Sequence, residues 1–331
     1  METTGLRIGI VGTSMIAHRF ADAAKRSGVV YPYAVCSRAE ETGLAFAEAE
    51  GGLLVETDFE RFLALHELDA VYIASPNALH FGQAMASLRA GKHVLLEKPT
   101  TSTLGEYRAL AAEAERRGLV LMEAMRPLHD PAFALVGSAI ERLGRIRRVD
   151  LEYCQYSSRY DRFLRGEVLN AFDPTLSNAA LMDIGVYPIA LLVALFGLPD
   201  RVCSDSLFLE NGFEGAGEML CRYPDFLATV SYSKITDSVA PSVITGELGS
   251  LSIDRINAPT RILLSLRSEP DAVLPCPSDE NNMVYEAIDF YRAVRGEISS
   301  APFTEYSERT AEMLDLVRRQ NGIVFPADNR L

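Results

Sequence analysis

The sequence predicts an α/β protein in which a parallel sheet with helices on both faces precedes a mainly antiparallel sheet. Up to about residue 125, short apolar segments alternate with segments that have the apolar spacing of amphipathic helices, which is typical of parallel strands joined by helices. After about residue 145, apolar and polar residues alternate with period two, as in half-buried antiparallel strands. The length of 331 residues suits two domains with separate cores.

The N-terminal part is expected to contain strands and helices that end at glycines or begin at capping residues. Gly12 ends the first strand, Gly91 and Gly118 end two helices, and Thr57 is expected to be an N-cap. The predicted strands are Leu6–Val11, Tyr33–Cys36, Leu53–Val55, Ala70–Ala74, His93–Leu96 and Leu119–Ala124. The predicted helices are Ile16–Arg26, Glu40–Glu50, Asp58–Leu65, Ala78–Ala90 and Leu104–Arg117.

The C-terminal part is expected to form the antiparallel sheet, with few helices. In Phe226–Ile235 the apolar set is Phe226, Ala228, Val230 and Tyr232, and the polar set is Thr229, Ser231 and Ser233. The other predicted strands are Arg147–Tyr156, Val202–Leu209, Glu218–Tyr223, Val243–Gly246, Ser250–Asp254 and Arg261–Leu266. The predicted helices are Ala179–Phe196, Asn282–Arg295 and Glu305–Gln320.

Composition narrows the class of protein. The formal net charge of −13 disfavours binding to a phosphate backbone, so no nucleic-acid partner is expected. The cysteines and histidines show no CxxC, HxH or HExxH spacing, so neither a metal site nor a disulfide framework is expected. We interpret the cysteines as small buried residues; they are Cys36, Cys154, Cys203, Cys221 and Cys276. No apolar run approaches the about 20 residues that cross a bilayer, and no targeting segment is evident, so a soluble cytoplasmic protein without membrane contact is predicted.

The turn after the first predicted strand has features of a dinucleotide-binding site. The stretch Gly9–Ala17 reads GIVGTSMIA and places Gly12 where a helix begins, so that backbone N–H groups and the helix dipole can bind a pyrophosphate. Dinucleotide folds usually have GxGxxG/A here, whereas Ser14 replaces the second glycine and Ala17 serves as the third. Ser14 can still cap the helix, but its side chain crowds the approach of the phosphate. The alternative is an ordinary glycine turn without a ligand.

The end of the second strand predicts the preferred cofactor. Folds that prefer NAD commonly place Asp or Glu there to bind the ribose 2′-hydroxyl. This chain has Ser37 and Arg38 instead, and Glu40 and Glu41 are expected to lie in the next helix. A hydroxyl and a guanidinium suit a 2′-phosphate, although Arg38 could also be an ordinary exposed loop residue.

The charged pair Glu97-Lys98 ends another apolar strand, directly before Pro99. Ligands of open α/β sheets bind beyond the carboxyl ends of the strands. The chain has only four lysines, the others being Lys25, Lys92 and Lys234. An ammonium at position 98 could donate to a substrate hydroxyl or lower the pKa of a neighbouring acid; a surface ion pair is the alternative.

Four stretches of the chain resemble the Gfo/Idh/MocA oxidoreductases, a family named for glucose–fructose oxidoreductase and inositol dehydrogenase. The stretches are Gly9–Ala17, Ala74–His80, Gly91–Pro99 and Leu121–Ala124, and their order and spacing match over nearly the whole chain. The resemblance implies an NAD(P)-binding Rossmann domain at residues 1–125. It implies a substrate-binding and oligomerisation domain with a large open-faced sheet at residues 126–331. The cofactor contacts expected from motif and resemblance are Gly12, Thr13, Ser14, Met15, Ile16, Ser37, Arg38, Ser75, Pro76, Asn77, His80, Glu97 and Lys98. For His80 a structural role is the alternative.

Asp183 and Tyr187 are four residues apart and share one face if the backbone there is helical. Many family members have histidine where Tyr187 stands. The tyrosine resembles the branch of the dihydrodiol dehydrogenases and NADP-linked xylose dehydrogenases, in which it is the catalytic acid/base. We expect Lys98 to lower the pKa of Tyr187. A core tyrosine beside a capping aspartate is the alternative.

These features predict an NADP-preferring oxidoreductase, with NAD as the alternative cofactor. It would transfer hydride between the nicotinamide and a carbinol or carbonyl carbon of a small sugar, polyol or cyclic diol. Lys98, Tyr187 and Asp183 would be catalytic, and Arg126 would join them in contacting substrate. Two other functions stay open, an NAD-dependent glycoside hydrolase and a non-enzymatic dinucleotide sensor. Arg159 and Arg162 are expected in a loop near the site.

The antiparallel strands outnumber the helices that could cover them, and the polar set at Thr229, Ser231 and Ser233 is small and uncharged. The family resemblance implies pairing through this open face. We therefore predict a homodimer, or a tetramer, built by isologous contact of the open sheets.

Overall fold

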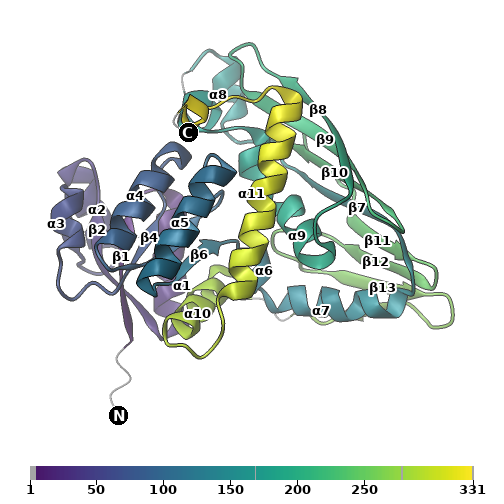
Figure 1. Cartoon of the computed structure of the whole chain (residues 1–331), viewed down its shortest axis with the longest axis horizontal. Coiled ribbons are helices and arrows are strands. Elements are labelled where there is room, and N and C mark those ends of the chain that lie inside the picture. The colour runs from purple at the N-terminus through teal and green to yellow at the C-terminus, as the bar shows by residue number, and fades with distance from the viewer. Residues whose placement is uncertain (1–4, 168, 277–278, 330–331) are drawn as a thin grey trace. The chain divides into compact units, whose positions relative to one another are not determined.

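Six apolar strands at the start of the chain form a parallel sheet (Figure 1). The order β3-β2-β1-β4-β5-β6 is that of the Rossmann fold, in which the strand order reverses between β1 and β4 and ligands bind beyond the carboxyl ends there. The strands are β1 Leu6–Val11, β2 Val30–Cys36, β3 Leu54–Glu56, β4 Ala70–Ile73, β5 His93–Glu97 and β6 Leu121–Ala124. The computed structural model describes residues 5–329 except 168, 277 and 278.

Helices cover both faces of this sheet, as the alternating pattern predicts. Helices α3, α4 and α5 bury apolar residues on one face, and α1, α2 and α10 bury theirs on the other. The bounds are α1 Met15–Ser27, α2 Glu40–Ala49, α3 Phe59–Leu63, α4 Asn77–Arg89, α5 Leu104–Arg117 and α10 Met283–Val294. The predicted N-cap Thr57 is wrong, because the Asp58 carboxylate accepts the N–H of Arg61 at 2.9 Å and caps α3.

The described residues fall into two units. The first comprises Met1–Arg126 and Asp279–Glu308, and the second comprises Pro127–Ser278 and Arg309–Leu331. Helix α10 therefore belongs with the Rossmann sheet, where Phe290 and Ala287 are fully buried beside residues of α1. The sequence prediction had placed this helix in a single C-terminal domain. Its apolar face does not reveal which sheet it covers.

The second unit contains a mostly antiparallel sheet in the order β14-β13-β12-β11-β7-β10-β9-β8. Its central pair, β7 and β10, is parallel. The strands are β7 Ile146–Cys154, β8 Arg201–Phe208, β9 Glu214–Arg222, β10 Leu227–Ser233, β11 Ser242–Gly246, β12 Gly249–Ile253, β13 Ile262–Leu266 and β14 Ala272–Leu274. The edge strand β14 has three residues, too few to show a period in the sequence.

Alternation along β10 follows the prediction with one exception. Ala228, Val230 and Tyr232 are buried, and Thr229 is half-exposed. Ser233, predicted on the polar face, is buried, because its hydroxyl accepts the N–H groups that follow the strand.

Helices of the second unit include several that the sequence prediction missed. They are α6 Arg126–His129, which begins at the last residue of the first unit, α7 Pro131–Ile140 and α8 Tyr160–Leu164. Asp130 accepts the N–H of Ala132 at 2.9 Å, and Pro131 occupies the first turn of α7. This Asp-Pro start is a recognisable sequence signal. Helix α9 Val186–Phe196 also lies in the second unit, whereas α11 Ala301–Asn321 begins in the first unit and continues into the second after Glu308. The 3-10 turns of the second unit include Asn170–Phe172 and Pro326–Asn329.

One segment, Pro174–Phe196, is long and apolar enough to cross a membrane by length and composition. The expectation that no such run exists was therefore wrong. Within the structure 78% of its apolar window is buried, as expected for the core helix of a globular unit. It is weak evidence for a membrane span.

The cysteines differ from their predicted burial. Cys36 and Cys221 are buried, but Cys154 and Cys276 are partly exposed and Cys203 is exposed on β8. All five are free thiols. Strand alternation places Cys203 outward, since the neighbouring Val202 faces the core.

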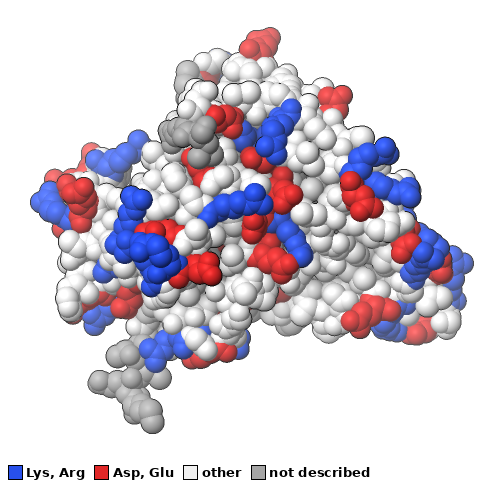
Figure 2. Space-filling model, viewed as in Figure 1, with Lys and Arg blue, Asp and Glu red and all other residues white. Residues whose placement is uncertain are grey.

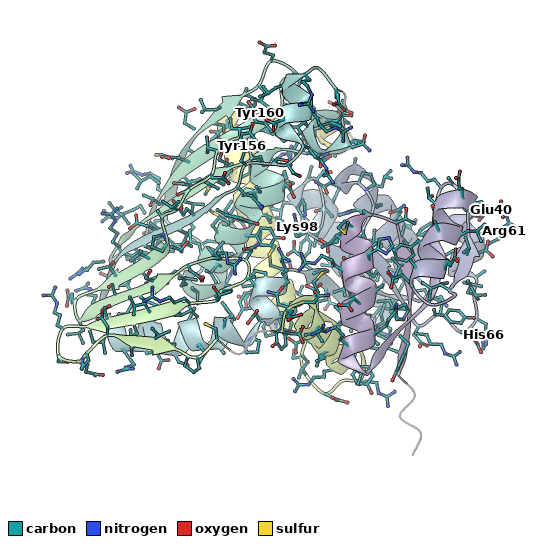
Figure 3. The ribbon with its side chains drawn as sticks, turned by 180° about the vertical axis from the view of Figure 1, so that it is seen from behind. Glu40, Arg61, His66, Lys98, Tyr156 and Tyr160 are labelled. Carbon is teal, nitrogen blue, oxygen red and sulfur yellow. The ribbon has the colours of Figure 1, made fainter. Side chains whose placement is uncertain are left out.

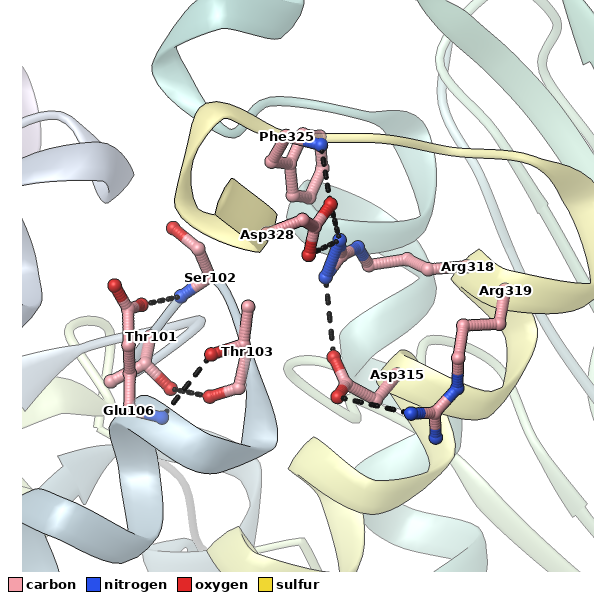
Figure 4. A network of polar contacts seen from close by, with 9 residues as sticks. All are labelled: Thr101, Ser102, Thr103, Glu106, Asp315, Arg318, Arg319, Phe325 and Asp328. Atoms are coloured by element: carbon pink, nitrogen blue, oxygen red, sulfur yellow. Dashed lines mark hydrogen bonds and ion pairs between the residues drawn. The ribbon is translucent and has the colours of Figure 1, made fainter. Parts of the chain in front are cut away.

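Polar networks fix chain segments within each unit (Figure 4). In the first unit, the Thr103 hydroxyl accepts the N–H of Glu106 at 3.2 Å, and the Glu106 carboxylate accepts the N–H of Ser102 at 3.1 Å. This reciprocal cap fixes the start of α5. In the second unit, the buried Arg318 donates to both oxygens of Asp328 at 2.7 and 2.6 Å and anchors the last 3-10 turn.

Charged side chains pair locally on the surface. On the face shown in Figure 2, acidic and basic side chains are mixed in small groups. On α5, for example, Glu113 lies 2.8 Å from Arg116 and 2.6 Å from Arg117. The excess negative charge therefore does not form one extended acidic area on this face.

Candidate active site

Gly12 makes the turn between β1 and α1 that the sequence predicts. Its φ of 104° favours glycine, and a Cβ there would lie 2.8 Å from the Ala74 carbonyl oxygen. Its N–H donates to the Cys36 carbonyl at 3.0 Å. The turn is therefore packed between the ends of β2 and β4, at the point where the strand order reverses. A larger residue would push the chain away from this position.

The first turn of α1 is open to an anion. Ser14 is the N-cap residue, but its side chain makes no capping hydrogen bond within the described part of the chain, and the first turn has no acidic residue. Ser14 therefore occupies the N-cap position without forming a side-chain cap among the described residues. Ser14 and Met15 are exposed, so the start of the helix is accessible to a ligand. This arrangement fits the pyrophosphate of a dinucleotide.

At the end of β2 the two predicted cofactor residues differ in environment. Ser37 is buried, and its hydroxyl shares a 2.8 Å hydrogen bond with Thr42. Arg38 is exposed. Glu40 and Glu41 begin α2 as predicted. Arg38 is thus the residue here with a charge available to a ribose phosphate, while Ser37 mainly fixes the turn.

His80 connects the turns that follow β4 and β5. It is buried, with Nδ1 2.9 Å from the Pro99 carbonyl oxygen and Nε2 2.9 Å from the Ser75 carbonyl oxygen. Burial lowers the pKa of His80. Because both ring nitrogens contact the backbone, the structural role is favoured over proton transfer. Ser75 also donates its hydroxyl to Gln83 at 2.6 Å, Pro76 is the N-cap residue of α4, and Asn77 begins that helix.

Lys98 lies at the carboxyl end of β5 and is half-buried (Figure 3). The preceding Glu97 is buried; its Oε1 accepts the Tyr72 hydroxyl at 2.5 Å and its Oε2 accepts the N–H of Lys98 at 3.2 Å. Burial raises the pKa of Glu97, and the charge of Lys98 opposes this shift. Glu97 therefore fixes the backbone from which the Lys98 ammonium extends.

Two further buried carboxyls lie in the same unit, and sequence reasoning missed both. Glu286 of α10 is fully buried, and neither carboxyl oxygen has a hydrogen-bond partner among the described residues. Burial and the charge of Glu97 raise the pKa of Glu286 well above its usual value, and Arg126 opposes this shift. Arg126 is predicted to contact substrate. Its positive charge acts on the buried carboxyls of Glu97 and Glu286.

The second buried carboxyl is that of Glu123 in β6. It accepts the N–H of Thr100 at 3.3 Å and the hydroxyl of Ser307 at 2.8 Å. Burial raises the pKa of Glu123 to about 7. Between the unfolded-state pKa of about 4.3 and this value, the unfolded chain releases a proton that the folded chain retains. The free energy of unfolding should therefore fall as pH rises through this window, by about 4 kcal/mol in total.

Replacing Glu123 with glutamine should remove this contribution, since the amide does not titrate. Urea unfolding of Glu123→Gln between pH 4.5 and 7.5 should show a flatter pH dependence than the wild type. As a control, Glu113→Gln should alter the profile only at lower pH, because Arg116 and Arg117 lower the pKa of Glu113 to about 2. An unchanged slope for Glu123→Gln would show that this carboxyl ionises normally.

In the second unit, Asp183 and Tyr187 lie on consecutive helical turns. Leu181–Gly185 is a π-helix, and α9 begins at Val186. The helical expectation is confirmed, with a wider first turn than an α-helix provides. Pro188 has no N–H to donate and would clash with an ordinary preceding turn, which accounts for the wide turn. Such π-turns are frequent at functional sites.

Both side chains have defined surroundings. Asp183 Oδ2 lies 2.8 Å from the Nζ of Lys234. Tyr187 is buried, and its ring meets that of Tyr153 edge-on at 5.5 Å. Lys234 was noted in the sequence only as one of four lysines. Lys234 directly follows the alternating strand β10, as Lys98 directly follows the apolar strand β5. This position at the end of a strand is the sequence signal that could have identified Lys234.

The loop after β7 carries the two arginines whose place the sequence left open. Arg162, on α8, pairs with Glu167 at 2.6 Å, and Arg159 precedes that helix. Tyr156 and Tyr160, labelled in Figure 3, meet edge-on at 5.4 Å. Both arginines are exposed. Within the described residues, no group of three or more His, Cys, Asp or Glu is placed to hold a metal ion.

The strand order, the Gly12 turn and the open N-terminus of α1 define a dinucleotide-binding protein of the Rossmann class. Residues 6–125 match the oxidoreductase family with an NAD-binding Rossmann fold, and residues 138–252 match the GFO/IDH/MocA C-terminal domain. The chain belongs to the Gfo/Idh/MocA family of oxidoreductases. The resemblance noted from four short stretches is therefore confirmed.

Full-length relatives carry named activities. The chain is 40% identical to scyllo-inositol 2-dehydrogenase (NADP(+)) of Bacillus subtilis (strain 168) over 325 residues, which cover 98% of this chain and 99% of the relative. It is 26% identical to trans-1,2-dihydrobenzene-1,2-diol dehydrogenase of Homo sapiens, covering 98% and 99% of the two chains. A 3-ketoreductase from Actinomadura kijaniata, solved with NADP and TDP-benzene, superposes with a TM-score of 0.86 at 25% identity, covering 96% and 98%.

Proposed function

We propose that this protein is an NADP-preferring dehydrogenase of a small cyclic polyol or sugar, with a carbinol carbon as the reacting centre. The observation that carries the proposal is 40% sequence identity, over 98% of this chain, to an NADP(+)-dependent scyllo-inositol dehydrogenase. The exposed Arg38, with no carboxylate at the end of β2, agrees with that cofactor. The uncapped first turn of α1 and the close approach at Gly12 fit its pyrophosphate.

The protein's own residues would bind the cofactor and move one proton. Bound NADP supplies the hydride acceptor. Gly12 and the N–H groups of Thr13–Ile16 would hold the pyrophosphate, and Arg38 the 2′-phosphate. Ser75, Pro76 and Asn77 would line the nicotinamide side, in turns that His80 and Glu97 fix.

Three residues would act on the substrate. Tyr187 would be the acid/base that exchanges the proton of the reacting hydroxyl, and Lys98 would stabilise the developing alkoxide charge. Asp183 would accept a hydrogen bond from a second hydroxyl. Solved structures of the related ketoreductase include a lysine-to-alanine and a tyrosine-to-phenylalanine variant, the same two residue types.

A substrate panel tests the proposal. Purified protein with NADP should oxidise scyllo-inositol or a related inositol, aldose or dihydrodiol, with NADPH formed in proportion to product. A glycoside hydrolase would instead release free sugar without net NADPH. A dinucleotide sensor would bind NADPH and turn over none of the panel. Either of those results would overturn the proposed reaction.

Arg38→Ala should change the cofactor preference. Loss of one charge-assisted contact should weaken NADPH binding about 10- to 100-fold and leave NADH affinity nearly unchanged. Fluorescence titration of both cofactors measures the effect. Arg61→Ala, on the exposed side of α3, is the matched control. Equal affinity of the wild type for NADPH and NADH would contradict the assignment.

We also propose a cytoplasmic location. All five cysteines are free, and Cys203 is exposed, which suits a reducing compartment.

The outward face of the second unit's sheet has a charge pattern that supports the predicted homodimer. Strand register aligns three rows across β8, β9, β10 and β7. The acidic row contains Asp205, Glu218, Ser231 and Glu152; the middle row contains Cys203, Leu220, Thr229 and Asp150; the basic row contains Arg201, Arg222, Leu227 and Arg148. Leu220 and Leu227 are exposed large apolar residues within these rows.

We propose that two copies pair through this face about a twofold axis along the middle row. The acidic row of one copy would then face the basic row of the other, with Glu218 opposite the partner's Arg222 on the same strand. Light scattering at micromolar concentration should give twice the chain mass, or four times for a tetramer. Glu218→Arg should weaken the dimer, and adding Arg222→Glu should restore it. A monomeric wild type would refute the interface.

A further inference from the structure

Lys234 is a buried lysine that pairs with Asp183. Its side chain is 5% exposed, and its Nζ lies 2.8 Å from Asp183 Oδ2 and 3.2 Å from the Ala171 carbonyl oxygen. The same Nζ lies 5.1 Å from the ring centroid of Phe172 and 5.5 Å from that of Phe213. A lysine side chain is almost never this buried unless it is paired. The carboxylate at 2.8 Å supplies that pairing.

The backbone of Lys234 is held rigidly. Its N–H donates to the Gly215 carbonyl at 2.9 Å, which continues the β9–β10 pairing, and its carbonyl accepts the N–H of Ser157 at 2.9 Å. The ammonium therefore extends from the sheet itself. The backbone carbonyl of Lys234 binds the segment after β7, and its ammonium joins the Asn170–Phe172 turn to the helical segment that carries Asp183.

The side chain of Asp183, unlike that of Lys234, is exposed. Its side chain is 42% exposed although its partner is buried, so the carboxylate extends from the interior to the surface of the unit. The surrounding π-turn is fixed separately: the N–H of Leu181 donates to the buried Glu214 at 2.9 Å, and Gly185 packs against the Tyr232 ring. The backbone at Asp183 is thus held without Lys234. What Lys234 adds is the orientation and the charge of one side chain.

We propose that Lys234 is a positioning residue that orients the Asp183 carboxylate and keeps it an acceptor for a substrate hydroxyl. The inference rests on the proposed role of Asp183 in substrate binding. An ammonium at hydrogen-bond distance stabilises the negative carboxylate and fixes one of its oxygens. A carboxylate held in this way selects substrates that present a hydroxyl donor, in addition to the hydroxyl that is oxidised.

The test uses Lys234→Met, Asp183→Asn and the double variant in the full-length protein. Methionine has a similar length and leaves Asp183 facing solvent, so Lys234→Met should fold. With scyllo-inositol and NADP, kcat/KM should fall about 10- to 100-fold in Lys234→Met, mainly through KM, because one hydrogen bond to a charged group is lost. The NADPH dissociation constant, measured by fluorescence, should not change. Lys25→Met, at an exposed lysine paired with Glu50, should behave as wild type.

The double variant distinguishes positioning from a purely structural role. If Lys234 acts through Asp183, adding Lys234→Met to Asp183→Asn should cause no further loss of kcat/KM. A loss of the same size in both backgrounds, or no loss in either, would overturn the inference. Because the comparison needs a folded single variant, Lys234→Gln, which also removes the charge, takes the place of Lys234→Met in both backgrounds if the methionine variant does not fold. Full activity of Asp183→Asn would instead reject the proposed role of Asp183, a separate result.

Discussion

Tyr187→Phe is expected to lower turnover at least about 100-fold, within the usual range for loss of an acid/base group. The substitution removes only the hydroxyl, so the buried ring keeps its contact with Tyr153. Cofactor affinity should hardly move, since the proposed cofactor residues belong to the first unit. Steady-state turnover and fluorescence titration of NADPH measure the two effects separately.

Tyr153→Phe is the matched control, because it removes a hydroxyl from the adjoining ring. That hydroxyl donates to Gln155 at 3.2 Å and accepts from Asn257 at 2.9 Å, so its loss should affect stability more than turnover. If Tyr187→Phe keeps near-normal turnover, Tyr187 is a packing residue and the proton acceptor must lie elsewhere.

Gly12→Ala is expected to weaken NADP binding about 100-fold, which corresponds to about 2.8 kcal/mol. A Cβ at this position would lie 2.8 Å from the Ala74 carbonyl oxygen, and the φ of 104° is strained for any L side chain. The turn must therefore shift, and the N–H groups of α1 shift with it. Isothermal titration calorimetry with NADP measures the loss.

Gly28→Ala is the control for Gly12→Ala, because it introduces the same kind of backbone strain without a close contact to the Cβ. Gly28 ends α1 with a φ of 69°, and a Cβ there meets nothing within 4 Å. The variant should lose about 1 kcal/mol of stability and bind NADP normally. Equal NADP affinity in the two variants would show that the Gly12 turn does not contact the cofactor.

The order of elements in the first unit was predictable because parallel strands and their helices carry local signals. β4, Ala70–Ile73, is buried along its whole length, so it appears in the sequence as a continuous apolar run. Helix ends were less predictable where side chains compete. Thr57 and Asp58 are both good capping residues, and only the backbone geometry selects Asp58.

The candidate site was predictable in part. Glu97, Lys98 and the Gly12 turn became candidates because each lies at the end of an apolar strand, where ligands of α/β sheets bind. Glu286 and Lys234 were missed because they belong to α10 and to the end of β10, far along the chain from the residues that they affect. A charged residue inside an apolar pattern resembles a surface position until its burial is known.

The sequence by itself therefore determined the two sheet types and the glycine turn after β1, since these depend on periodicity and on neighbouring residues. Tertiary structure alone decided that α10 covers the Rossmann sheet and that Lys234 pairs with Asp183. It also decided that His80 contacts the Pro99 carbonyl and that the charge of Arg126 acts on the buried Glu286. The physical reason is that burial and charge pairing join residues distant in sequence. An apolar helix face or a lone lysine does not encode its partner; only packing in three dimensions selects it.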